Sequence, residues 1–186
     1  MQSAFIKNVY FLLLLLAISC AETDTIQMSE DELTRVSFTS TETDAEKDFF
    51  LYLPEGYHNQ PERSWPVILF LHGNGERGNS REELNFVMKH GPLYEAWVQR
   101  KPLPFLIISP QLPMFGMDTL GISYLQNRDL KDFPDRLATG VPDREPVSSS
   151  EQPMTGAAEV SIEELRLPPA GWEKVEDDLL TILETV

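Results

Sequence analysis

The feature that most constrains this chain is an apolar run that ends in a glycine-rich segment. Residues 65–71 read WPVILFL, and residues 72–78 read HGNGERG directly after them. A continuous run of apolar and β-branched residues predicts a strand buried on both faces, as in the middle of a parallel sheet. The glycines that follow give the backbone the freedom to leave the strand in a tight turn.

Apolar runs and helical patterns alternate around this strand. The sequence predicts strands at 48–53 (DFFLYL) and 105–109 (FLIIS), a weak strand at 35–40, and a helix that begins at Arg81 after the capping box SREE. A second helical piece is expected over 93–100. Residues 171–186 place apolar side chains at helical spacing, which predicts an amphipathic helix on the sheet. Strands alternating with helices indicate an α/β fold with a largely parallel sheet.

Regular patterning stops over residues 114–170, which are rich in proline and contain a run of serines. A stretch of this length is unusual inside a compact domain, where it is typical of a lid, a binding excursion or disorder. We expect an irregular insertion with short helical pieces.

The first 34 residues carry an export pattern. Residues 9–18 are apolar and follow Lys7, which predicts a signal peptide over 1–19 that is too short to span a membrane. LAISC at 16–20 resembles a bacterial lipobox, with Ala17 where leucine is usual, and predicts lipidation of Cys20. Ordinary cleavage at a small-x-small site and a retained anchor are the alternatives. Residues 20–34 predict an acidic tether, so the protein is expected to be exported, either held on a bacterial envelope membrane or released.

Composition excludes several classes of function. The chain has 186 residues and a formal net charge of −15, which argues against nucleic-acid binding. One cysteine excludes an internal disulfide and a cysteine-rich zinc site, and the three histidines are scattered, so no metal is expected. Residues 73–78 match G-x-G-x-x-G, but His72 before them and a helix starting only at Arg81 fit a dinucleotide turn poorly.

A family resemblance appears at residues 66–78, PVILFLHGNGERG. This segment resembles the third strand and oxyanion loop of α/β-hydrolase esterases, in the branch that spans prolyl-oligopeptidase-like, dienelactone-hydrolase-like and polyhydroxybutyrate-depolymerase-like enzymes. Residues 49–66 and 104–113 are similar to the second and fourth strands of these enzymes, and residues 171–186 to the helix before their nucleophile strand. The resemblance covers residues 36–113 and 171–186.

The resemblance implies a secreted or lipid-anchored serine hydrolase that cleaves an ester or peptide bond through an acyl-enzyme, without a cofactor. Its substrate is a small-molecule or polymeric ester or a peptide. Backbone N–H groups then stabilise the oxyanion, and the amide of Asn74 or Gly75 is one expected donor. The expected oxyanion hole comprises Gly73, Asn74 and Gly75. Three neighbours are expected to support this loop without acting as the base: His72, Glu76 and Arg77.

The nucleophile of these enzymes sits in a G-x-S-x-G elbow, which this sequence lacks. Residues 121–125 (GISYL) have no second glycine and follow no predicted strand, so Ser123 is not the expected nucleophile. No histidine follows His90. We expect residues 35–186 to be the N-terminal part of a longer hydrolase, inactive alone, with the catalytic Ser, Asp and His beyond Val186. The expected fold is an incomplete α/β-hydrolase fold, a mostly parallel sheet with flanking helices.

The missing nucleophile strand has a structural consequence, because in this family it lies beside the third strand. Residues 67–71 are therefore expected to present an unpaired apolar edge. Other interpretations stay open. One alternative is that HGNG is only a tight turn between a strand and a helix. Another is that the chain is a non-enzymatic surface lipoprotein or binding module on a hydrolase-like scaffold. A polymer-binding accessory protein is a further alternative, based on the aromatic residues Trp65, Trp97, Trp172 and Phe115.

Overall fold

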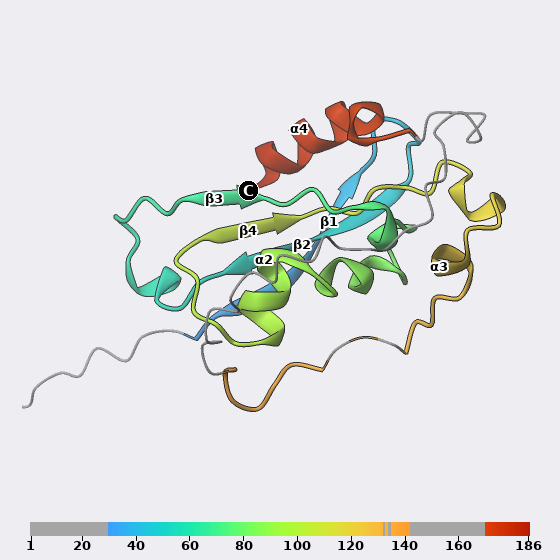
Figure 1. The fold of residues 1–186 in the computed structure, drawn as a ribbon. Coiled ribbons are helices and arrows are strands. Elements are labelled where there is room, and N and C mark those ends of the chain that lie inside the picture. The colour runs from blue at the N-terminus through green and yellow to red at the C-terminus, as the bar shows by residue number, and fades with distance from the viewer. Residues whose placement is uncertain (1–29, 132, 134, 142–169) are drawn as a thin grey trace, which may run out of the picture.

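The computed structural model describes residues 30–131, 133, 135–141 and 170–186 (Figure 1). One sheet holds four strands: β1 (Glu32–Thr39), β2 (Glu46–Leu53), β3 (Val67–Leu69) and β4 (Leu106–Ser109). Their order across the sheet is β1-β2-β4-β3. The pairs β1–β2 and β2–β4 are antiparallel, and β3–β4 is parallel.

Short helices fill the connections between and after the strands. After β2 and β3 come the 3-10 turns η1 (Tyr57–Asn59) and η2 (Asn74–Glu76). Before β4 lie η3 (Leu84–Met88), α2 (Gly91–Leu93) and the π-helical η4 (Tyr94–Val98). The later elements are η5 (Met117–Thr119), α3 (Ser123–Gln126), η6 (Trp172–Val175) and α4 (Glu176–Thr185).

The predicted mostly parallel sheet with flanking helices is wrong. The described residues form a small mixed sheet in which one pair is parallel, with few and mostly short helices. The cause is the hairpin of β1 and β2, which pair along their full length from Glu32↔Leu53 to Thr39↔Glu46. Strands joined by such a short turn are antiparallel, because a parallel pair needs a long crossover. Strand and helix alternate only from β3 onward, so the alternating pattern correctly predicts a parallel arrangement for β3 and β4 alone.

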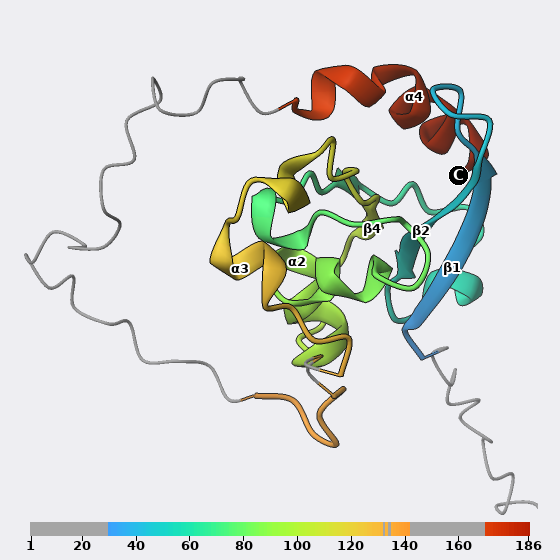
Figure 2. The same cartoon turned by 90° about the vertical axis from the view of Figure 1, so that its right-hand side faces the viewer.

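The sheet buries side chains on both faces, since successive residues of a strand point to opposite sides. On one face Phe50, Tyr52 and Ile107 pack with residues of η3, α2 and η4. On the other face Phe49 and Ile108 pack against Ile182 of α4. Figures 1 and 2 show this layering, with α4 on one side of the sheet and the η3–η4 region on the other.

β3 is shorter and more exposed than its apolar sequence predicts. Val67 is 51% exposed and Leu71 is 41% exposed, so the predicted burial on both sides is wrong. Pro66 and Phe70 hydrogen-bond to β4 through their backbones, and in a parallel pair the intervening residues face away from that neighbour. In the described part of the chain no strand pairs with this second edge. The expected unpaired apolar edge is therefore present among the described residues.

The helix predicted from Arg81 is replaced by a 3-10 turn at Leu84–Met88. The side-chain acceptor in the segment before this turn is Asn79 rather than Ser80: its Oδ1 accepts hydrogen bonds from the N–H groups of Arg81 (2.9 Å) and Glu83 (3.1 Å). Ser80 has a φ of 57°, and its N–H donates to Gln111 Oε1 at 2.7 Å. A tertiary contact thus overrides the local capping signal. The second helical piece, predicted over 93–100, is confirmed by α2 and η4.

The amphipathic helix predicted over 171–186 is confirmed by η6 and α4, with Val175 and Ile182 buried. Asp178, which the pattern places with the polar residues, is nevertheless only 3% exposed. Its carboxylate accepts hydrogen bonds from Ser40 Oγ (2.8 Å) and the Thr41 N–H (2.7 Å). This contact fastens α4 to the turn of the β1–β2 hairpin.

Lys47 completes the cluster around Asp178. Its ammonium lies 3.1 Å from Asp178 Oδ2 and 2.9 Å from Ser40 Oγ. Burial opposes the ionisation of Asp178, but the hydrogen bonds from Ser40, Lys47 and Thr41 outweigh it and hold the pKa of Asp178 below its usual value.

The predicted signal peptide and the lipidation residue Cys20 lie outside the described residues. β1 begins at Glu32, so the last residues of the predicted tether, 32–34, belong to a strand. Of the predicted insertion, the described part holds η5 and α3, and residues 142–169 lie outside it. Among the described helices, none has the length and apolarity required to cross a membrane.

Candidate functional site

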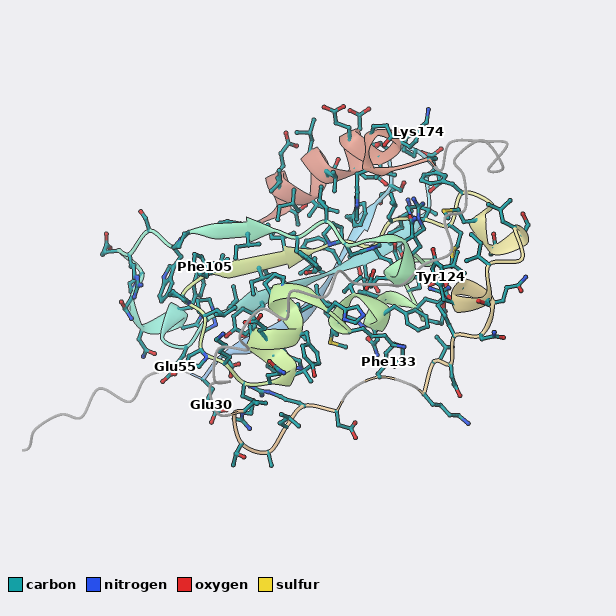
Figure 3. The ribbon with its side chains drawn as sticks, in the orientation of Figure 1. Glu30, Glu55, Phe105, Tyr124, Phe133 and Lys174 are labelled. Atoms are coloured by element: carbon teal, nitrogen blue, oxygen red, sulfur yellow. The ribbon has the colours of Figure 1, made fainter. Side chains whose placement is uncertain are left out.

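The candidate site is the loop of residues 72–78, which leaves β3 at its carboxyl end and forms η2. Because β3 and β4 are parallel, the segment that follows β4 reaches the same edge of the sheet. The Gly78 N–H donates to the Leu112 carbonyl at 3.0 Å and joins the two segments. Tyr124 and Lys174, labelled in Figure 3, mark this end of the molecule.

Several backbone N–H groups of the loop, Asn74 and Gly75 among them, have no acceptor among the described residues. A 3-10 turn leaves its first N–H groups without acceptors inside the turn. A Cβ added at Gly75 meets no heavy atom within 4 Å, so the space beside this residue is open. Unpaired amides beside open space are suited to binding a negatively charged oxygen.

His72 anchors the beginning of the loop. Its Nε2 accepts a hydrogen bond from the Leu112 N–H at 2.9 Å, and its Nδ1 lies 2.7 Å from the Gly73 carbonyl. This pair of contacts assigns the proton to Nδ1 and leaves the ring neutral. Burial lowers the pKa of His72, which favours the same neutral form. With both ring nitrogens engaged, His72 is placed to orient the loop.

Trp172 of η6 packs on the same histidine. The two ring centroids are 5.0 Å apart with the rings nearly perpendicular, and the Trp172 indole N–H donates to the His72 carbonyl at 3.1 Å. The segment that precedes α4 therefore helps to hold the residue from which the loop starts.

The buried side chain of Arg77 supports the middle of the loop through hydrogen bonds. This side chain is 2% exposed and donates from Nε to Asn74 Oδ1 at 2.9 Å. Its two Nη atoms donate to the carbonyls of Pro113 (2.7 Å) and Ala170 (2.6 Å). Burial lowers the pKa of Arg77, but a guanidinium stays protonated in proteins. The loop is therefore backed by a buried positive charge whose partners are neutral oxygens.

Gln111 holds the end of the loop. Its Nε2 donates to the carbonyls of Glu76 (2.8 Å) and Glu83 (2.7 Å), and its Oε1 accepts from the Ser80 N–H. A Cβ added at Gly78 would lie only 2.5 Å from the same amide, so a larger residue there would displace the Gln111 side chain. One buried side chain after β4 thus fixes three backbone groups of the segment after β3.

The carboxylate of Glu76 lies near two histidines. The residue is 8% exposed, and its carboxylate lies 4.0 Å from His72 Nδ1 and 3.7 Å from His90 Nε2. His90 is largely exposed on the far side of this carboxylate. Glu76 therefore lies between the loop and the one histidine that is near the site and still has an exposed ring.

No nucleophile is assembled in the described part of the chain. Ser123 is exposed at the start of α3 and has no hydrogen bond to a histidine, and Ser80 is buried against Gln111. His58 pairs with Glu32 at 3.2 Å, outside the candidate loop. The structure thus brings the predicted residues 72–77 together and adds no serine–histidine pair to them.

The described residues contain no group of three or more His, Cys, Asp or Glu side chains that could hold a metal ion. Compared with protein-family models and with curated proteins, the sequence matches none of them. The interpretation of residues 66–78 as a strand and an oxyanion loop therefore stays a prediction.

Sequence reasoning missed three contributors to the site: Gln111, Trp172 and His90. Gln111 had a usable signal, because it directly follows a strand predicted to end at the same sheet edge as the loop. Trp172 and His90 had none, since their contacts depend on how distant segments pack.

Proposed function

We propose that this chain carries the oxyanion loop of an exported serine hydrolase that cleaves carboxylic ester or peptide bonds through an acyl-enzyme. The observation that carries the proposal is that the N–H groups of Asn74 and Gly75 have no acceptor among the described residues, with open space beside Gly75. The resemblance of residues 66–78 to α/β-hydrolase esterases connects that geometry with a reaction. The nucleophile, acid and base are expected beyond Val186.

The chemistry requires donors that are already in place. Attack on a carbonyl carbon moves negative charge onto its oxygen, and fixed N–H groups stabilise that charge without reorganising at the moment of reaction. The braces described above supply this rigidity: His72 at the start of the loop, Arg77 below it and Gln111 at its end. The buried guanidinium of Arg77 also adds positive potential on the same side.

The state of His72 supports a base located elsewhere. A general base needs a ring nitrogen that reaches the nucleophile, and both nitrogens of His72 are occupied. His72 is therefore a positioning residue in this proposal.

The open edge of β3 supports a further strand in the complete enzyme. Val67 and Leu71 are exposed there, and the backbone groups of alternate residues point away from β4. The alternative function, a non-enzymatic binding module, requires a sheet that is stable without a further strand beside β3. A stable, monodisperse 186-residue chain favours this alternative, and an aggregating chain favours the hydrolase.

The test compares two substitutions at Gly75 in the protein made from the complete reading frame. Gly75→Pro removes the N–H group, whereas Gly75→Ala keeps it and fills the same open space. With p-nitrophenyl acetate we expect Gly75→Pro to lower kcat by about 100- to 1000-fold and Gly75→Ala by less than about threefold. Equal activity of the two variants would contradict an oxyanion role for this amide.

A fluorophosphonate probe tests the placement of the nucleophile. We expect it to label the product of the complete reading frame and to leave residues 1–186 unlabelled. Labelling of any serine in the 186-residue chain contradicts a nucleophile beyond Val186, and no labelling of either protein contradicts the hydrolase.

Export with lipidation at Cys20 belongs to the same proposal. Growth with a labelled fatty acid should yield a labelled protein, and Cys20→Ala should abolish the label. A wild-type protein that is exported and carries no label supports ordinary signal-peptidase cleavage instead.

A further inference from the structure

A pocket of about 430 Å³ lies at the opposite end of the parallel strands. Its lining includes Trp65, just before β3, and Leu106, the first residue of β4. The candidate oxyanion loop follows the carboxyl end of β3, so the two sites are separated by the length of the strands. Glu55 and Phe105, labelled in Figure 3, mark the end of the molecule where β4 begins.

Three rings follow one another along this pocket. The centroids of Tyr57 and His58 are 5.3 Å apart, and those of Tyr57 and Trp65 are 6.0 Å apart. The guanidinium of Arg63 lies 3.7 Å from the centroid of the Trp65 ring. The pocket therefore combines aromatic walls with a cation held on one of them.

A second arginine–tryptophan pair in the chain shows what a purely structural pair looks like. The Arg136 guanidinium lies 3.6 Å from the centroid of the Trp97 ring. Its Nη2 also bonds both carboxylate oxygens of Asp31, at 2.6 and 2.8 Å, and its Nε donates to the Trp97 carbonyl. This pair is closed, because the guanidinium already has a bidentate carboxylate.

Arg63 has the same stacking but lacks the carboxylate. The one hydrogen bond that its side chain makes among the described residues goes from Nη1 to Gln60 Oε1, at 3.1 Å, and no carboxylate of those residues lies within ion-pair distance. The nearby acid Glu32 is already engaged by Thr34 (2.8 Å) and His58 (3.2 Å). The pocket thus contains a guanidinium with unused donors and no competing acid.

Other donors of the pocket residues are also unused. The indole N–H of Trp65 is buried without a hydrogen-bond partner in the described part of the chain. Gln60 uses its carbonyl oxygen on Arg63, so its amide N–H groups stay available. The donors that a ligand can reach are those of Arg63 and Gln60, and they select a ligand that supplies acceptor oxygens.

We propose that this pocket binds a small organic carboxylate with a flat apolar body. The carboxylate pairs with the edge of the stacked Arg63 guanidinium, whose planar fork matches two carboxylate oxygens. The flat body packs against the rings of Tyr57 and Trp65. The site is independent of the proposed hydrolase activity and is tested by binding alone.

The probes are benzoate, its neutral isostere benzamide, and acetate, which has the charge without the ring. The readout is the NMR signal of the indole N–H groups of Trp65, Trp97 and Trp172, assigned with Trp→Phe variants. We expect benzoate to shift the Trp65 signal in a saturable way, and benzamide and acetate to bind at least about tenfold more weakly. The signals of Trp97 and Trp172 should stay in place.

Matched variants locate the charge that is responsible. Arg63→Gln should weaken benzoate binding at least about tenfold, which corresponds to the loss of one charged pair. Arg136→Gln, at the closed pair, should leave the affinity within about twofold, measured on a variant whose circular dichroism matches the wild type. Equal affinity for benzoate and benzamide contradicts the carboxylate, and a benzoate response that never saturates contradicts the site.

Discussion

The two ends of the parallel strands use the same kinds of side chain in opposite ways. The carboxyl end holds a histidine, an arginine, a glutamine and a tryptophan: His72, Arg77, Gln111 and Trp172. The amino end holds the same four types: His58, Arg63, Gln60 and Trp65. At the carboxyl end the first three are at most 5% exposed. At the amino end, by contrast, the side chain of His58 is 55% exposed.

The partners of these side chains explain the difference. Arg77 and Gln111 donate to backbone carbonyls of segments distant in sequence, and so they fix the course of the chain. Arg63 and Gln60 bond each other, three residues apart, and fix only their own loop. A polar side chain thus shapes a site when its partners are backbone groups of other segments. The same side chain is free to bind a ligand when its partners are local.

The arginines should show the largest contrast between the two ends. Arg77→Ala removes three hydrogen bonds of a buried cation and should lower the free energy of unfolding by about 3 kcal/mol or more. Arg63→Ala should lower it by less than about 0.5 kcal/mol, because that side chain is exposed. Urea unfolding of both variants measures the difference. A small effect of Arg77→Ala would show that this side chain does not hold the loop in place.

The glutamines should give the next largest contrast. Gln111→Ala removes the partner of two buried backbone groups and of a third, part-buried one, and should cost about 2–3 kcal/mol of unfolding free energy. Gln60→Ala should cost about 0.5 kcal/mol or less. Hydrogen exchange gives a local check, since the Ser80 amide should lose protection only in the Gln111 variant. Unchanged protection would mean that Gln111 does not hold this segment.

The histidines should differ in their effect on pH dependence. Burial lowers the pKa of His72 in the folded chain from its ordinary 6.5, so below that pH the unfolded chain binds more protons. The stability contributed by neutral His72 is therefore present above pH 6.5 and lost as the pH falls toward its folded pKa. The slope should reach at most about 1.4 kcal/mol per pH unit. Unfolding between pH 7.5 and about 5.5 should show it in wild type and in His58→Phe, and show less of it in His72→Phe.

The tryptophans should give the smallest contrast. Trp172→Phe loses the hydrogen bond to the His72 carbonyl and should cost about 1 kcal/mol. Trp65→Phe removes a buried N–H group that has no partner among the described residues, so its hydrogen-bond cost should be close to zero. Thermal unfolding compares the two variants. An equal loss in both would show that the indole of Trp65 is bonded in solution.

The sequence predicted the local elements better than their assembly. The strands at β2 and β4 and the helix at the C-terminal end follow from apolar runs and helical spacing, and all three are present. The parallel sheet was wrong because strand direction depends on the short hairpin turn after β1. The burial predicted for β3 was wrong. An apolar run indicates a preference for a buried strand, but it does not determine how many strands lie beside it.

The candidate site shows the same division. The motif at residues 72–78 located the loop, and its small residues indicated an open backbone. The residues that hold the loop include 111, 113, 170 and 172. Of these, Gln111 had a sequence signal, because it comes soon after a predicted strand, whereas nothing in the sequence connects residues 170 and 172 with the loop. Asp178 is a further example, since a carboxylate on a helix looks solvent-facing until Lys47 and the hairpin turn are placed beside it.

The contact between Asp178 and Lys47 also bears on the order in which the protein is made. Lys47 lies in the second strand and its carboxylate partner is 131 residues later. While the chain emerges from the ribosome, the β1–β2 hairpin is complete long before α4 exists. A buried ammonium without its counter-charge is unfavourable, so we expect Lys47 to stay hydrated until Asp178 has been synthesised. Closure of the sheet face on which α4 packs therefore waits until that helix has been synthesised.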